Sequence, residues 1–107
     1  MAELTVFGGG TWGTALAVSA AKSGHSVMLW CRRAEQARAI NATSHNPDYL
    51  QAIELPEAIS STSDPEEAAL FSQHWILALP TQTVRGFLPA LAPFCGKETE
   101  VCNVAKG

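Results

Sequence analysis

The chain has 107 residues, of which 47% are hydrophobic and 16% are charged, and its formal net charge is −3. This length predicts one domain of ordinary globular composition with a modest core. No basic run is longer than Arg32–Arg33, so the sequence argues against a nucleic-acid partner. No apolar run approaches the roughly 20 residues that span a bilayer, which argues against a membrane span.

The N-terminus lacks a basic leader and a cleavage site, so we expect no signal peptide and a cytoplasmic location. The three cysteines, Cys31, Cys95 and Cys102, are an odd number without metal-ligand spacing. We therefore expect reduced, mostly buried thiols and no metal site.

The first predicted elements surround a glycine-rich turn. The apolar run 4–7 meets Gly8, Gly10 and Gly13 in the spacing G-x-G-x-x-G, and a small-residue helix pattern follows at once. A strand before and a helix after these glycines is the context of a dinucleotide-binding turn. Gly8 would permit the tight turn, Gly10 the close approach of a pyrophosphate, and Gly13 close helix–sheet packing. The alternative is a strand–helix turn that binds nothing.

The helix is predicted over 12–23, with Thr11 as its N-cap and Gly24 as a left-handed stop. A buried parallel strand over 26–31 follows, and a right-handed crossover would place it beside the first strand. A second helix is predicted over 33–42, with Gln36 on its exposed face. Residues 43–58 contain two prolines and few helix signals, and they are expected to be an irregular, functional or mobile loop.

The second half continues the alternation. A weak strand at 59–62 precedes Asp64-Pro65, a strong helix start in which Glu67 would reach back to the cap backbone. The remaining predicted elements are a helix at 65–71, a strand at 74–79, a helix at 83–91 and a strand at 100–104. Alternating strands and helices predict an α/β fold of the Rossmann type, a doubly wound parallel sheet of about five strands in three αβα layers. We assign residues 1–107 to this one domain.

The end of the second strand indicates which dinucleotide the turn would prefer. In an NAD-type site an acidic residue stands about 20 positions past the glycines, whereas Arg32 and Arg33 occupy this region. Guanidinium groups suit a bidentate grip on a 2′-phosphate, so we expect NADP to be preferred over NAD, or both to be accepted. The alternative is that both arginines merely begin an exposed helix.

Two further residues are candidates because ligands bind outside the carboxyl ends of parallel strands. Pro80 ends the fourth strand and could run along the cofactor, and Lys106 follows the fifth strand and could face an anion. The three histidines are dispersed and form no metal-ligand pattern. His45, in the long loop, is a weaker candidate for a ligand contact.

Several segments together resemble the bacterial-type NAD(P)-dependent glycerol-3-phosphate dehydrogenases. They are GGGTWGTALA (8–17), VMLWCRR (27–33), NPDYL (46–50), ALPTQTVRGFL (78–88) and VAKG (104–107). One departure is Leu50-Gln51-Ala52, where the family usually has Leu-Pro-Gly.

The resemblance implies a cytoplasmic enzyme of glycerophospholipid precursor synthesis that interconverts dihydroxyacetone phosphate and sn-glycerol 3-phosphate. It implies that Thr11 and Trp12 contact the cofactor, that Arg32 and Arg33 lie near its 2′-phosphate, and that Lys106 lies between nicotinamide and substrate. The family's general base and substrate-phosphate residues belong to a C-terminal helical domain. We expect this chain to lack that domain, to hold no catalytic residue of its own and to be inactive alone.

Two alternatives stay open at this point. The chain could be a dinucleotide-binding module without catalysis, or part of a related 6-phosphogluconate- or ketopantoate-type reductase. A homodimer also stays open, because an exposed sheet edge or face would invite self-association.

Overall fold

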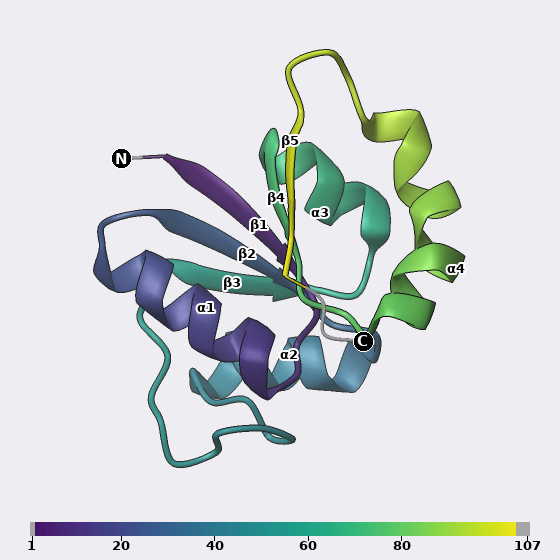
Figure 1. The fold of residues 1–107 in the computed structure, drawn as a ribbon. Helices are drawn as coiled ribbons and strands as arrows, with labels where there is room; N and C mark the ends of the chain where they lie inside the picture. The colour runs from purple at the N-terminus through teal and green to yellow at the C-terminus, as the bar shows by residue number, and fades with distance from the viewer. Residues whose placement is uncertain (1, 105–107) are drawn as a thin grey trace.

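The fold is a single twisted parallel sheet flanked by helices (Figure 1), in a computed structural model that describes residues 2–104. All strand pairings in the described residues are parallel. The strands are β1 (Glu3–Phe7), β2 (Ser26–Trp30), β3 (Ile59–Thr62), β4 (His74–Leu77) and β5 (Glu100–Asn103). The helices are α1 (Thr11–Lys22), α2 (Ala34–Thr43), α3 (Pro65–Phe71) and α4 (Thr81–Leu91), with a short 3-10 turn η1 (Ala92–Phe94).

The strand order is β3-β2-β1-β4-β5, which confirms the doubly wound α/β prediction. The chain builds outward from β1 through β2 to β3, and then returns to the other side of β1 for β4 and β5. The loops after β1 and β4 therefore leave the sheet in divergent directions. In folds of this kind ligands bind in the crevice at that switch point, outside the carboxyl ends of the strands.

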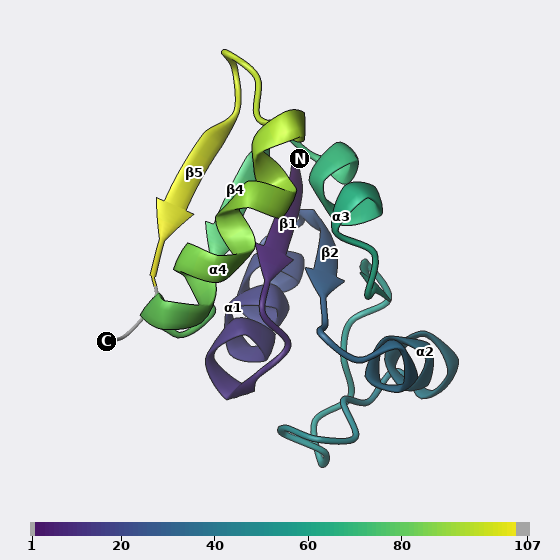
Figure 2. The ribbon, with the colours of Figure 1, turned by 90° about the vertical axis from the view of Figure 1, so that its right-hand side faces the viewer.

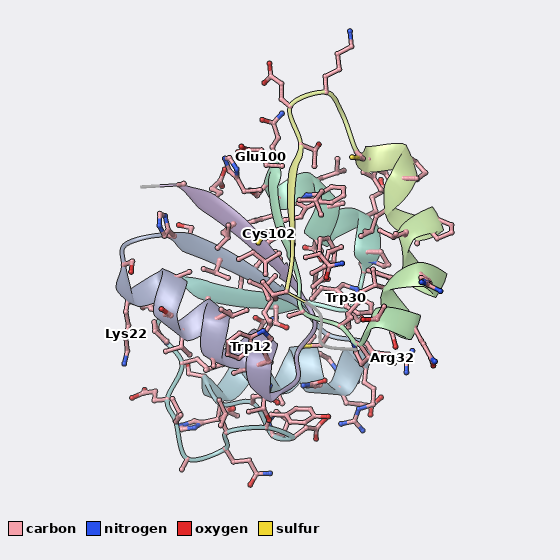
Figure 3. The ribbon with its side chains drawn as sticks, in the orientation of Figure 1. Trp12, Lys22, Trp30, Arg32, Glu100 and Cys102 are labelled. Carbon is pink, nitrogen blue, oxygen red and sulfur yellow. The ribbon has the colours of Figure 1, made fainter. Side chains whose placement is uncertain are left out.

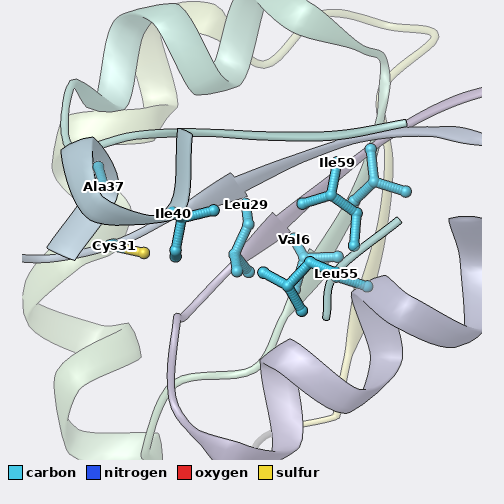
Figure 4. Packing of buried hydrophobic residues seen from close by; sticks show 9 residues of the cluster. Val6, Leu29, Cys31, Ala37, Ile40, Leu55 and Ile59 are labelled. Carbon is cyan, nitrogen blue, oxygen red and sulfur yellow. The ribbon is translucent and has the colours of Figure 1, made fainter. Parts of the chain in front are cut away.

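Each face of the sheet has its own core because successive strand residues point to opposite faces. One face packs under α1 and α2 and includes Cys31 and Leu55 (Figure 4). The other face packs under α3 and α4, which lie together on one side of the sheet (Figure 2). That second core is aromatic, since the Phe7 ring lies 5.6 Å from Trp75 and 5.8 Å from Phe87, and Trp30 lies 4.5 Å from Phe87.

The start of α1 differs from the prediction. Gly10, in an extended conformation, is the N-cap, and Thr11 is the first helical residue. The predicted Thr11 cap was therefore wrong by one position. The other end is as predicted, since Gly24 has a φ of +98° and donates to Ala21 O while His25 donates to Ala20 O. These two bonds satisfy the last carbonyls of the helix in a Schellman motif.

The predicted N-cap of α3 is confirmed, but the predicted contact from Glu67 back to the cap backbone is not. The Asp64 side chain accepts a hydrogen bond from the Glu66 N–H, and Pro65 is the first helical residue. Glu67 accepts instead from the Thr62 hydroxyl, and that hydroxyl accepts from the Asp64 N–H. Thr62 thus bridges two groups that were expected to bond directly.

Burial corrects two expectations about side chains. Gln36 is buried at 5% exposure rather than lying on the exposed face of its helix. Cys31 is buried as expected, but Cys95 and Cys102 are exposed. The described residues contain no helix that is long and apolar enough to cross a membrane.

Candidate functional site

The glycine turn after β1 is shaped by two positions that exclude any side chain. Gly8 has a φ of +129°, and a Cβ there would lie 2.7 Å from Ala78 O, one residue past the end of β4. A Cβ on Gly13 would lie 1.8 Å from Gly8 O. The turn therefore folds back tightly onto β4, and the first turn of α1 presses against the turn itself.

The two glycines between them face opposite surroundings. A Cβ on Gly9 would lie 2.5 Å from Cys31 Sγ, so this residue packs inward. A Cβ on Gly10 would meet nothing within 4 Å. Open space beside bare backbone at a helix N-terminus is the arrangement that admits an anion, because N–H groups there lack intrahelical partners.

A pocket of about 460 Å³ opens over this turn, a volume typical of small-molecule sites. It lies at the carboxyl ends of β1, β2 and β4, where the topology predicts a ligand. Its lining residues are Gly8, Gly9, Gly10, Thr11, Trp12, Arg32, Gln36, Tyr49, Ala78, Leu79, Pro80 and Thr83.

Trp12 and Arg32 approach the pocket from different elements (Figure 3). Trp12 is 47% exposed on the first turn of α1, and the exposed Arg32 follows β2. A flat aromatic surface and a guanidinium at one opening suit a ligand that carries both rings and phosphates.

Arg33 is placed differently from Arg32. Its guanidinium forms a short ion pair with Asp48 in the long loop, and the Glu35 carboxylate lies 3.9 Å away. The hydrogen bond from Arg33 to Asp48, with the charge of that carboxylate, raises the pKa of Arg33. This guanidinium is thus engaged by a carboxylate and does not line the pocket.

Six of the nine sequence-predicted contacts line the pocket: Gly8, Gly10, Thr11, Trp12, Arg32 and Pro80. Gly13 lies beneath the turn and Arg33 beside it. Lys106 lies outside the described residues. The predicted loop residue His45 bonds Gln51 O through its Nδ1, at 2.9 Å.

The sequence reasoning missed several lining residues, among them Gly9, Gln36 and Tyr49. Tyr49 was visible in the NPDYL segment, but nothing local shows that this loop reaches the glycine turn. Nothing in the sequence indicated that Gln36 would line the pocket, because a polar glutamine in the first turn of a helix is expected to be exposed.

Cys31 lies directly behind the turn and is not a reactive group. Burial raises the pKa of its thiol, and the hydrogen bond with Ser61 lowers that pKa by less. The thiol is therefore neutral at physiological pH and acts as packing under Gly9.

A second hollow of about 540 Å³ is larger but lies at the amino ends of β1 and β4, lined by residues such as Glu3, Ser72 and His74. Volume alone would favour it. The topology favours the first pocket, because ligands of doubly wound sheets bind at the carboxyl ends of the strands.

The doubly wound sheet, the glycine turn and the pocket above it define a dinucleotide-binding type of α/β domain. The family model for the N-terminus of NAD-dependent glycerol-3-phosphate dehydrogenase matches residues 3–107. This chain belongs to that family.

Individual relatives agree with this assignment. A glycerol-3-phosphate dehydrogenase [NAD(P)+] of Streptomyces avermitilis is 47% identical over 105 residues, covering 98% of this chain and 31% of the relative. One of Corynebacterium aurimucosum is 43% identical over 107 residues, covering 100% and 32%. The crystal structure of glycerol-3-phosphate dehydrogenase from Coxiella burnetii has the same fold, with a TM-score of 0.92 at 24% identity over 99% of this chain and 33% of that one. The chain spans about a third of the length of these relatives.

Proposed function

We propose that this chain binds NADP or NAD at the pocket over the glycine turn, with NADP preferred. The pyrophosphate would lie against the backbone of Gly8 and Gly10 and the first turn of α1. Thr11 and Trp12 would contact the cofactor from that turn, and Pro80 would border it from the end of β4. Gly13 would support the turn from beneath.

The observation that carries the cofactor preference is the charge around the pocket. None of the described lining residues is Asp or Glu, and Arg32 is among them. An NAD-type ribose site would need a carboxylate acceptor, whereas a 2′-phosphate needs a cation. Arg32 would therefore be the main 2′-phosphate contact. Arg33 would add positive charge nearby, weakened by its pairing with Asp48.

The chain would be the cofactor half of a cytoplasmic sn-glycerol-3-phosphate dehydrogenase in glycerophospholipid precursor synthesis. The bound cofactor would supply the hydride for reduction of dihydroxyacetone phosphate. The described residues would bind and orient the dinucleotide, and Lys106 would contact cofactor or substrate. The acid–base group and the substrate-phosphate contacts would come from a helical domain outside this chain. The curated relatives' names and their greater length support this division.

The proposal is tested by titrating the chain with NADPH and NADH at several salt concentrations while following tryptophan fluorescence. We expect saturable binding, tighter for NADPH, with an advantage that shrinks as salt screens the 2′-phosphate. Arg32→Ala should weaken NADPH binding about tenfold while leaving NADH binding nearly unchanged. Arg33→Ala should have a smaller effect of the same kind.

The matched control is Arg38→Ala, which removes an exposed guanidinium from α2 that does not line the pocket. Equal and unsaturable responses to both nucleotides would exclude the site. The chain alone should also show no turnover, so dehydrogenase activity in the purified 107 residues would contradict the proposed division of labour.

Self-association is the second part of the proposal. β5 is the last strand of the described sheet, and all four of its residues are exposed. An exposed edge with an apolar residue such as Val101 favours pairing with a second copy.

A further inference from the structure

Asn46 is fully buried although it belongs to the irregular segment between α2 and β3. A buried amide costs free energy unless its donors and acceptor are all bonded. Its Nδ2 donates to Gly9 O at 2.9 Å and to Thr14 Oγ1 at 2.9 Å. Its Oδ1 accepts from Gln36 Nε2 at 3.0 Å, and from two amides of its own loop. The donor nitrogen and the acceptor oxygen of the Asn46 amide are thus both hydrogen-bonded.

The Gly9 carbonyl is the point on which these side chains converge. It accepts from Asn46 Nδ2, from Gln36 Nε2 at 2.9 Å and from Thr14 Oγ1 at 3.3 Å. Three side-chain donors from three separate parts of the chain are more than a turn carbonyl needs. They hold this oxygen toward the protein interior.

The orientation of that carbonyl decides what the next residue presents. In a planar trans peptide the C=O and the following N–H point to opposite sides. A Gly9 carbonyl held inward therefore directs the Gly10 N–H away from the interior. Gly10 lines the pocket, and a Cβ on it would meet nothing within 4 Å.

The side-chain oxygen of Asn46 orders the loop that forms the pocket wall opposite the glycine turn. Its Oδ1 accepts from the Asp48 N–H at 3.0 Å and the Tyr49 N–H at 3.3 Å. Tyr49 lines the pocket, and Asp48 holds Arg33. One amide therefore joins the glycine turn to the loop that faces it.

We propose that Asn46 is a positioning residue that, by holding the Gly9 carbonyl inward, aims the Gly10 N–H at the pyrophosphate of the bound dinucleotide. This rests on the proposed function, since it names which group of that ligand the turn contacts. Gln36 and Thr14 complete the same cluster.

The test compares Asn46→Ala with Asn41→Ala in the 107-residue chain. Asn41 is a matched control because its amide also bonds backbone on both sides, donating to Ser61 O at 2.8 Å and accepting from Ser61 N at 2.9 Å. It lies on α2 and does not line the pocket. Both variants lose an amide with backbone bonds, but only one should change the glycine turn.

The readouts are the affinities for NADPH and for 2′-AMP, which carries the 2′-phosphate without a pyrophosphate. We expect Asn46→Ala to weaken NADPH binding about tenfold, as for loss of one charge-assisted hydrogen bond, and to leave 2′-AMP binding within about twofold. Asn41→Ala should change neither. The NMR signals of Gly9 C′ and Gly10 N–H should shift in Asn46→Ala only.

If Asn46→Ala does not fold, Asn46→Asp takes its place, because it keeps the acceptor for the Asp48 and Tyr49 amides while removing the donor to Gly9. A carboxylate that acted only by charge repulsion would weaken NADPH and 2′-AMP alike. Unchanged NADPH affinity in the variant overturns this inference alone, as would equal losses for both ligands. Absence of NADPH binding by the unmodified chain overturns the proposed function together with it.

Discussion

Single residues in the glycine turn have separate physical duties. Gly8 is required by its positive φ and its approach to β4, and Gly13 by its approach to the turn. The tight turn expected at Gly8 agrees with its positive φ, whereas the closest approach at Gly13 is to the turn itself rather than to the sheet. Gly9, which the spacing leaves unspecified, is constrained too, by the Cys31 side chain packed behind it rather than by backbone. The fingerprint thus names only part of what the turn requires.

Replacement of Gly13 by alanine should disrupt the turn. The new Cβ would lie 1.8 Å from Gly8 O, so backbone has to move, and we expect a loss of at least about 2 kcal/mol in unfolding free energy together with lost NADPH binding. Urea unfolding followed by circular dichroism measures the first effect.

The control is Gly86→Ala in α4, where a Cβ meets nothing within 4 Å. This change should stabilise the chain by about 0.5–1 kcal/mol, because alanine has the higher helix propensity. A Gly13→Ala variant as stable as the unmodified chain would show that the close contact is not real.

At the scale of elements, the buried residues Trp75 and Trp30 show how differently α3 and α4 are attached to one face of the sheet. Trp75 on β4 donates from Nε1 to Ser72 O at 2.8 Å and to Ala69 O at 3.3 Å, which ties the end of α3 to the sheet. Trp30 on β2 packs against Phe87 of α4, and its Nε1 has no hydrogen-bond partner among the described residues. α3 is held by packing and hydrogen bonds, whereas Trp30 holds α4 by packing.

The same substitution in both positions should therefore have unequal costs. Trp75→Phe removes ring volume and leaves two carbonyls without this donor, while Trp30→Phe removes ring volume and an unsatisfied buried N–H. We expect Trp75→Phe to destabilise the chain by about 1 kcal/mol more than Trp30→Phe. Urea unfolding monitored by circular dichroism checks this. Equal losses would mean that the Trp75 bonds contribute nothing net.

At the scale of the whole molecule, the sheet is covered unevenly. β1, β2 and β4 lie between helical layers, but β5 is exposed along its length and Val101 is 47% exposed. An edge strand of this kind is a template for pairing with another chain.

Val101→Lys should reduce self-association, since a charge on an edge strand opposes strand pairing. Sedimentation velocity over a concentration series should show larger species for the unmodified chain and a smaller share of them for the variant. Leu70→Lys is the matched control, because Leu70 is 66% exposed and belongs to α3 rather than to the edge strand. A chain that stays monomeric at every concentration would contradict the proposed self-association.

The sequence by itself determined the elements whose signals are local. The glycine spacing, the Asp64-Pro65 helix start and the Gly24 stop depend on backbone conformation and neighbouring atoms. Strand β3 and helix α3, which lie on either side of Asp64, were predicted to the residue. The alternation of strands and helices then determined the fold class, because a parallel sheet needs a crossover between strands.

Only the tertiary structure decided which distant groups meet. Asn46 reaches the Gly9 carbonyl across 37 positions of the chain, and Arg33 pairs with Asp48 instead of joining Arg32 at the pocket. Gln36 is buried, against its local pattern, where its Nε2 donates to the Gly9 carbonyl and to Asn46 Oδ1. Such contacts follow from how helices and loops pack on the sheet, and neighbouring residues in the sequence carry no signal of them.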